Sequence, residues 1–260
     1  MLSITPIPAL NDNYIWHLAK DNQHWVVDPG EAEPVIKALN GAPLSGILIT
    51  HHHYDHTGGI KALHKQYQCP VFGPKSIKGV TNPIAGGDHF SLLGLALEVW
   101  DIPGHTLDHL AIILTEESSG GRSQPHLFCG DTLFAAGCGR LFEGSPKQMY
   151  DSLQKLTSLP QGTRVYCAHE YTLGNLHFAH TIEPGNSVTS KRLADSQVLR
   201  EAGKPTLPST IAEEIATNPF LRCHIPEVAQ SGAKHLGQDS SKQLDEVEIF
   251  ASLRDWKDHF

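Results

Sequence analysis

The segment Thr50-His-His-His-Tyr-Asp-His-Thr-Gly-Gly59 constrains this chain more than any other. It follows the apolar run Gly46 to Thr50 and holds four potential metal ligands within six residues, namely His51, His53, Asp55 and His56. Alternation along an extended segment puts His51 and His53 on the same side, so both imidazoles can reach one ion. The turn that follows can aim Asp55 and His56 at a second ion. The segment therefore predicts a metal site at the end of a strand, with His52 pointing away.

Taken alone, a run of histidines also fits a surface accident or a solvated loop that binds metal weakly. Three further segments have the same form, an apolar strand ending in a metal-capable residue: Pro103-Gly-His-Thr-Leu-Asp-His109, Phe128-Cys-Gly-Asp131 and Tyr166-Cys-Ala-His169. Strands of one sheet that end together bring such residues to one edge, where open α/β folds place their sites. Four such segments favour a single shared metal centre.

Composition excludes several classes of protein. The 260 residues carry a net charge of −8, which gives no broad attraction for nucleic acid. No apolar run approaches the roughly 18 residues of a membrane span, so no membrane partner is expected. The chain has five cysteines, which is an odd number, and it has no Cys-x-x-Cys motif. Both features favour reduced thiols over disulfides. The N-terminus also lacks the features of a secretory signal, so we expect a cytoplasmic protein.

The order of the predicted elements indicates an α/β fold in two parts. Strands are predicted at 15–19, 24–27, 46–50, 95–100, 109–114, 126–129 and 163–168, and helices after Gly59, after Ser145-Pro146 and after a cap at Thr210. Beyond about Tyr171 helical signals dominate, and the polar stretch Gln230 to Lys242 is expected to be an exposed loop. We predict a layered α/β domain at 1–169 and an α-helical domain at 170–260.

The metal-binding segments resemble those of the metallo-β-lactamase superfamily, and more closely those of the glyoxalase II (hydroxyacylglutathione hydrolase) family. The resemblance runs nearly end to end. It implies an αββα sandwich with a smaller helical C-terminal domain. It also implies two divalent metal ions per chain, with Asp131 bridging a first set and a second set of ligands. The implied first set is His51, His53, His109 and Asp131, and the implied second set is Asp55, His56, Asp131 and His169. In this interpretation His105 is structural or supports a ligand.

The resemblance extends to the substrate side. The segment Gly137-Cys-Gly-Arg-Leu-Phe-Glu-Gly144 resembles the family's glutathione-contacting loop, which implies contacts from Arg140 and Phe142. Tyr171 matches a substrate-binding tyrosine. Arg254 and Lys257 resemble a terminal basic pair that holds the glycine carboxylate of glutathione, and residues three apart share a helix face. On a terminal helix, however, such cations are usually solvated charges.

Two positions depart from the family pattern, and a third matches it. Phe142 stands where many members have a tyrosine, which removes a hydroxyl donor, and Asp108 stands where a glycine is common, which adds negative charge near the metals. Asp28, in Val27-Asp-Pro-Gly30, resembles a position that orients the site, although a turn residue before Pro-Gly is an equal alternative.

The function implied by the resemblance is hydrolysis of the thioester S-(2-hydroxyacyl)glutathione, most closely S-D-lactoylglutathione, to D-lactate and glutathione in methylglyoxal detoxification. Asp55 and Asp131 are the candidate catalytic residues. Imidazole and carboxylate ligands fit Zn and also accept Fe or Mn. No Gly-x-Ser-x-Gly elbow is present, and two bridged metals would make a protein nucleophile unnecessary. We expect a monomer.

The main rival is a persulfide dioxygenase with one iron, for which His51, His109 and Asp131 would supply the ligands. The complete second ligand set and the basic C-terminal segment argue against it. Hydrolysis of β-lactams and cleavage of nucleic acid are further options for the superfamily, but the acidic chain disfavours the latter. A non-enzymatic metal-binding module is disfavoured because it would need no adjoining peptide pocket.

Overall fold

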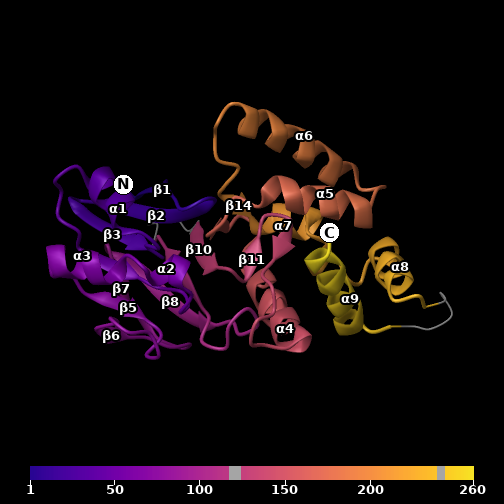
Figure 1. The fold of residues 1–260 in the computed structure, drawn as a ribbon, viewed down its shortest axis with the longest axis horizontal. Helices are drawn as coiled ribbons and strands as arrows, with labels where there is room; N and C mark the ends of the chain where they lie inside the picture. Colours follow the sequence, from indigo (N-terminus) through magenta and orange to yellow (C-terminus); the bar gives the residue numbers. More distant parts are fainter. Residues whose placement is uncertain (117–123, 239–243) are drawn as a thin grey trace.

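Two six-stranded sheets packed face to face form the larger part of the molecule (Figure 1). The computed structural model describes residues 1–116, 124–238 and 244–260. The sheets and the helices on their outer faces form an αββα sandwich, and the remaining helices gather on the side where the orange and yellow part of the chain lies (Figure 1). The predicted fold class is confirmed.

The first sheet has the order β1-β2-β3-β4-β5-β6, antiparallel from β1 to β3 and parallel from β3 to β6. Its strands are β1 (Ser3–Ala9), β2 (Asn13–Lys20), β3 (Gln23–Val27), β4 (Gly46–Leu48), β5 (Val71–Gly73) and β6 (Asn82–Pro83). The prolines of β1 hide it from sequence patterns, and its edge position explains how they are tolerated.

The second sheet has the order β14-β13-β10-β9-β8-β7, in which only β13 and β10 are parallel. Its strands are β7 (His89–Leu92), β8 (Leu95–Asp101), β9 (Leu110–Thr115), β10 (Pro125–Gly130), β13 (Arg164–Cys167) and β14 (Ser209–Thr210). A small hairpin, β11 (Leu133–Phe134) with β12 (Gly137–Cys138), follows β10. Every strand predicted from the sequence overlaps one of these elements.

The helices divide between the sandwich and the C-terminal part. The first group is α1 (Ala32–Leu39), α2 (Tyr54–Thr57), α3 (Ile60–Tyr67) and α4 (Pro146–Thr157). The second group is α5 (Thr172–Ile182), α6 (Ser187–Glu201), α7 (Ile211–Thr217), the 3-10 turn η1 (Pro219–Leu221), α8 (Pro226–His235) and α9 (Glu246–Asp258). The domain boundary after residue 169 stays a prediction, because β14 from the C-terminal part also extends the second sheet.

Alternating apolar residues explain the layers. Ile15, Val26 and Ile47 face α1 and α3, whereas their neighbours Trp16, Val27 and Leu48 belong to the core shared with the second sheet. Ser145 caps α4 with a full capping box, and Thr210 caps α7 by accepting from the Glu213 amide. Both predicted helix starts are confirmed.

The expected loop over Gln230 to Lys242 is wrong for its first part. Gln230 to His235 complete α8, whose polar face is exposed while Val228, Gly232 and Ala233 are buried. The small size of Gly232 and Ala233 disguised the buried face in the sequence. Residues 239–243 lie outside the described ranges. Within those ranges no helix is long and apolar enough to cross a membrane.

Candidate metal centre and substrate pocket

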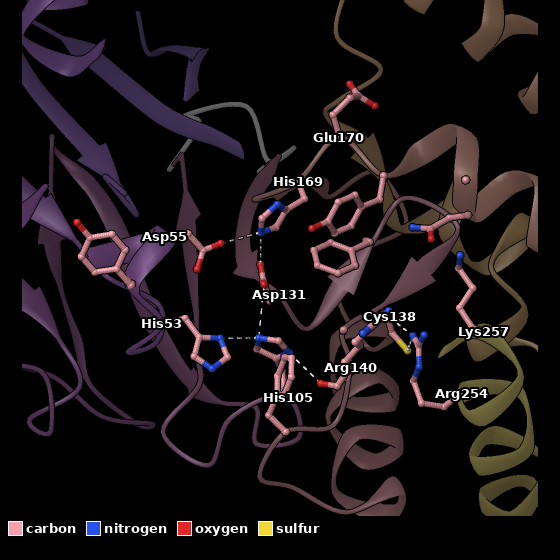
Figure 2. Close-up of a pocket in the computed structure, with 17 residues that line it drawn as sticks. His53, Asp55, His105, Asp131, Cys138, Arg140, His169, Glu170, Arg254 and Lys257 are labelled. Carbon is pink, nitrogen blue, oxygen red and sulfur yellow. Dashed lines mark hydrogen bonds and ion pairs between the residues drawn. The ribbon is translucent and has the colours of Figure 1, made fainter. Parts of the chain in front are cut away.

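The histidine segment lies at the end of β4, where the chain leaves the first sheet and turns into α2. Ring nitrogens of His51, His53 and His105 lie within 4.8 Å of one another. His105 Nε2 is 3.0 Å from His53 Nδ1 and 3.4 Å from Asp131 Oδ2. Figure 2 shows His53 and His105 converging below Asp131. These four residues form a first candidate ligand set.

His109 does not join this set, which contradicts the choice of His109 over His105 made from the sequence. His109 is fully buried behind the centre, where its Nε2 accepts the Asp131 backbone N–H at 3.1 Å and its Nδ1 lies 3.2 Å from the Leu110 carbonyl. Both ring nitrogens are therefore engaged. The structure instead aims His105 Nε2 at the centre, with its Nδ1 donating to the Arg140 carbonyl at 2.8 Å. His109 positions the Asp131 backbone.

Asp55, His56 and His169 form the second candidate set, and their ligand atoms also lie within 4.8 Å of one another. His169 Nε2 is 3.4 Å from Asp55 Oδ2 and 3.3 Å from Asp131 Oδ1. His56 Nε2 is 3.3 Å from the same Asp131 oxygen. Asp131 therefore faces the first set with one carboxylate oxygen and the second set with the other, as Figure 2 shows.

Two glycines make this approach possible. A Cβ on Gly130, whose φ is +45°, would meet Thr50 Oγ1 at 2.4 Å. A Cβ on Gly139 would lie 1.9 Å from the Asp131 carbonyl oxygen and 3.0 Å from His105 Nδ1. Larger residues at either position would displace the chain that carries Asp131.

Among the residues that the structure describes, several buried polar atoms at the centre have no hydrogen-bond partner, including His51 Nε2, His56 Nε2 and Asp131 Oδ1. Leaving such atoms unsatisfied costs about 1–3 kcal/mol each, so their convergence indicates a missing partner. Imidazole nitrogens and carboxylate oxygens are the ligands that Zn, Fe and Mn accept. The residues present therefore fit bound metal.

The electrostatics agree with this view. Burial lowers the pKa of His51 well below its usual range, which keeps its imidazole neutral and able to bind metal. Burial would raise the pKa of the Asp131 carboxyl, but the neighbouring His56 and His169 hold it well below its usual range. Asp131 is therefore an anion in a buried site.

Side chains behind the ligands fix their orientation. Asp28 accepts from the Thr50 amide at 2.8 Å and hydroxyl at 2.7 Å, and its Oδ2 lies 3.1 Å from His56 Nδ1. Its backbone adopts φ 52°, a left-handed conformation that these contacts support. Asp28 therefore orients His56, as the resemblance suggests.

Two residues that sequence reasoning missed act in the same way. Asp12 Oδ1 lies 2.7 Å from His169 Nδ1, and Asn13 Nδ2 donates to Asp55 Oδ2 at 3.1 Å. Asp12 lies in the loop between β1 and β2 and Asn13 begins β2, so both are far from the histidine segment in sequence. Only their proximity in the fold reveals them.

A cavity of about 910 Å³ opens from the metal centre toward the C-terminal helices. Phe142 and Tyr171 flank its inner end. Phe142 lies edge-on to His53 and His105 at 5.4 and 5.2 Å between ring centroids, and Tyr171 stacks on His169 at 4.7 Å. Both aromatic rings remain substantially exposed, so they are available to a ligand in the cavity.

The three cations predicted to bind substrate line the far end of this cavity (Figure 2). Arg254 is buried, and it donates to the Cys138 carbonyl at 2.7 Å and to Asp258 at 2.9 Å. Arg140 is exposed, with its Nε 3.4 Å from Asp258. Lys257 Nζ lies 5.6 and 5.4 Å from the ring centroids of Phe178 and Phe260, and burial with the nearby arginines lowers its pKa.

Asp108 lies outside the cluster of ligands. Its carboxylate contacts His52 Nδ1 at 2.8 Å and accepts from the Ser76 hydroxyl at 2.7 Å. His52 thus points to Asp108 on the exposed side, away from the first ligand set. The Asp108 carboxylate therefore links its own loop to the loops that carry His52 and Ser76.

The fold and the metal centre define a protein of the metallo-β-lactamase class. Residues 12–169 match the metallo-beta-lactamase superfamily, and residues 170–260 match the hydroxyacylglutathione hydrolase C-terminus. A crystal structure of ETHE1 from Myxococcus xanthus superimposes with a TM-score of 0.62 at 22% identity, covering 99% of this chain and 98% of that one. This likeness supports the fold.

Curated relatives specify the family. The hydroxyacylglutathione hydrolase of Alkalilimnicola ehrlichii is 51% identical over 99% of both chains. That of Nitrosomonas europaea is 47% identical over 100% of this chain and 97% of its own length. The chain belongs to the hydroxyacylglutathione hydrolase family.

Proposed function

We propose that this chain is a dinuclear metallohydrolase that cleaves S-(2-hydroxyacyl)glutathione, in particular S-D-lactoylglutathione, to the hydroxy acid and glutathione. The observation that carries the proposal is the position of Asp131 between two ligand sets, at the inner end of a cavity whose outer end holds Arg254 and Lys257. The full-length relatives named hydroxyacylglutathione hydrolase support it.

The proposed ligands are divided between two sites. His51, His53, His105 and Asp131 would hold one ion, and Asp55, His56, His169 and Asp131 the other. Two divalent ions held in this way would activate water and polarise the thioester carbonyl. His105 replaces His109 in this set because its Nε2 faces the Asp131 carboxylate, whereas His109 Nε2 accepts the Asp131 backbone N–H.

The side chains around the centre orient the reacting groups. Asp55 and Asp131 line the cavity at the centre, where their carboxylates would contact the reacting atoms. Asn13 holds Asp55 Oδ2, and Asp12 fixes the His169 ring so that Nε2 faces inward. The Phe142 and Tyr171 rings flank the position of the thioester and limit the access of bulk water.

The proposed orientation of the substrate in the cavity follows from the positions of the charged side chains. A glutathione thioester is anionic, and the chain's net charge of −8 gives it no general attraction. The cations at the far end of the cavity supply a local attraction for this anion. The Lys257 ammonium is the better candidate for the glycine carboxylate, because Arg254 already donates to Cys138 and Asp258. With the glycine carboxylate at this end, the scissile carbonyl would lie at the metal centre.

Zinc is the proposed metal, with iron and manganese as alternatives that the same ligands accept. The cysteines are free and buried, which supports the proposed cytoplasmic location. The monomeric state stays a prediction. The complete second ligand set disfavours the rival persulfide dioxygenase with a single iron, because such an enzyme has no use for Asp55, His56 and His169 as ligands.

A side-by-side turnover assay tests the proposal. The purified protein should hydrolyse S-D-lactoylglutathione and contain two metal ions per chain in the same sample. Oxidation of glutathione persulfide by a protein with one iron per chain, without thioester hydrolysis, would reverse the choice between the two functions.

A further inference from the structure

The hairpin β11–β12 lies between Asp131, which faces both ligand sets, and Arg140, whose carbonyl contacts a ligand of the first set. Asp131 lies two residues before β11, and Arg140 lies two residues after β12. The Arg140 carbonyl holds His105 Nδ1, and Asp131 faces both ligand sets. The position of this short hairpin therefore determines where two of the proposed ligands lie.

Side chains from the C-terminal part hold the hairpin through its backbone. The Gly137 and Phe134 carbonyls accept from Asn218 Nδ2 at 2.9 and 3.3 Å. The Ala136 amide donates to Glu214 Oε2 at 2.7 Å. Two further carbonyls, those of Ala135 and Cys138, accept from Asn175 and Arg254 at 3.1 and 2.7 Å. Each residue from 134 to 138 thus has a backbone group bound by a helical-domain side chain.

Glu214 is the unusual member of this group because it is a fully buried acid. Arg192 NH2 donates to its Oε1 at 2.7 Å, and its Oε2 accepts from the hairpin and, at 3.4 Å, from Asn218 Nδ2. A buried charge is costly unless it is paired and hydrogen-bonded, and here the pair directs one carboxylate oxygen at Ala136. Ala136 has φ 53°, a left-handed conformation that favours glycine, so the turn needs this external support.

We propose that Glu214 and Asn218, with Arg192 behind them, are positioning residues for the metal centre. They act from the helical domain by fixing the hairpin, and through it Asp131 and His105. The inference rests on the proposed metal centre, but it assigns the C-terminal domain a role beyond binding glutathione. Removing a group that hydrogen-bonds directly to a ligand typically lowers metal affinity 10–100-fold, and we expect these contacts, which act through the hairpin, to lie at the lower limit of about tenfold.

Two size-matched variants test the proposal. Glu214→Gln keeps one side-chain oxygen, which can still accept from Arg192. The other oxygen becomes an NH2 group, which cannot accept the hydrogen bond from the Ala136 amide. Asn218→Asp removes both donors to the hairpin carbonyls. We expect each zinc-loaded variant to release metal to a chelator about tenfold faster than the wild type, with a smaller gap in Tm between the loaded and metal-free forms.

The control is Glu183→Gln. Glu183 is also buried and pairs with Arg222 at 2.7 Å in the helical domain, and within the described ranges it makes no hydrogen bond to the hairpin. This variant should lower Tm equally in both forms and leave metal release unchanged.

Wild-type metal release and an unchanged Tm gap in Glu214→Gln would overturn the proposal, as would equally fast release from Glu183→Gln. If Glu214→Gln does not fold, the same two measurements on Asn218→Asp decide. Neither measurement needs a substrate, so the result is independent of which thioester the chain hydrolyses.

Discussion

Replacing His105 with glutamine should weaken the first metal site far more than the same change at His109. Zinc bound by four protein ligands contributes about 10–16 kcal/mol, so one ligand contributes about 3 kcal/mol, or roughly a hundredfold in affinity. His105 is one of four proposed ligands, with its Nε2 3.4 Å from Asp131. His109→Gln keeps an oxygen that can accept the Asp131 amide, so its cost is limited to about 1 kcal/mol, or about fivefold.

Competition with a chromophoric chelator would measure the affinity of each variant, and elemental analysis would give the metal content. Thermal unfolding of the metal-free proteins is the control for folding. Equal losses in the two variants, or a greater loss at His109, would refute the assignment and restore His109 as the ligand.

Asp131→Ala should abolish hydrolysis and reduce occupancy of both sites, because each set loses an oxygen; two tightly bound metals per chain would contradict the bridge. Lys257→Met should raise KM for lactoylglutathione about 10–100-fold with little change in kcat, since a charge-assisted hydrogen bond contributes about 1.5–3 kcal/mol equally in ground and transition states. A thioester without the glutathione glycine is the matched substrate, and an equal loss on it would exclude a carboxylate contact. In the metal-free protein, burial lowers the pKa of His109 from 6.5 to about 3. The neutral imidazole therefore stabilises the folded protein above pH 6.5, and this stabilisation is lost as the pH falls toward 3. The free energy of unfolding of metal-free His109→Gln should therefore fall less steeply in this range, by about 1.4 kcal/mol per pH unit, and identical slopes in urea titrations would disprove this.

The sequence predicted the strands that alternate and end in metal-capable residues, because the two-residue period of a strand is local. It could not choose between His105 and His109. Both lie in the irregular connection between β8 and β9, where alternation no longer fixes direction and Gly104 has φ 158°. The interpretation of the family pattern favoured His109, and only the packed structure showed that the His105 ring faces the Asp131 carboxylate.

Residues that act across long sequence distances were also beyond prediction. Asp12, Asn13 and Glu214 have no surrounding motif, and their roles come from tertiary contacts with the histidine segment and the hairpin. The substrate cations were located by resemblance alone. The structure added the finding that Arg254 supports the hairpin through Cys138.

The second ligand set joins segments far apart in the chain, which has a consequence for the order of folding. His169 contacts Asp12 and Asn13, 157 and 156 residues earlier in the chain, and Asn13 forms a bridge to His169. Closing so long a loop has a large entropic cost, so these contacts form only when both sheets have come together. A growing polypeptide has only part of the second site until His169 has left the ribosome. A metal ion at the second site would therefore stabilise the assembled fold and would not nucleate it.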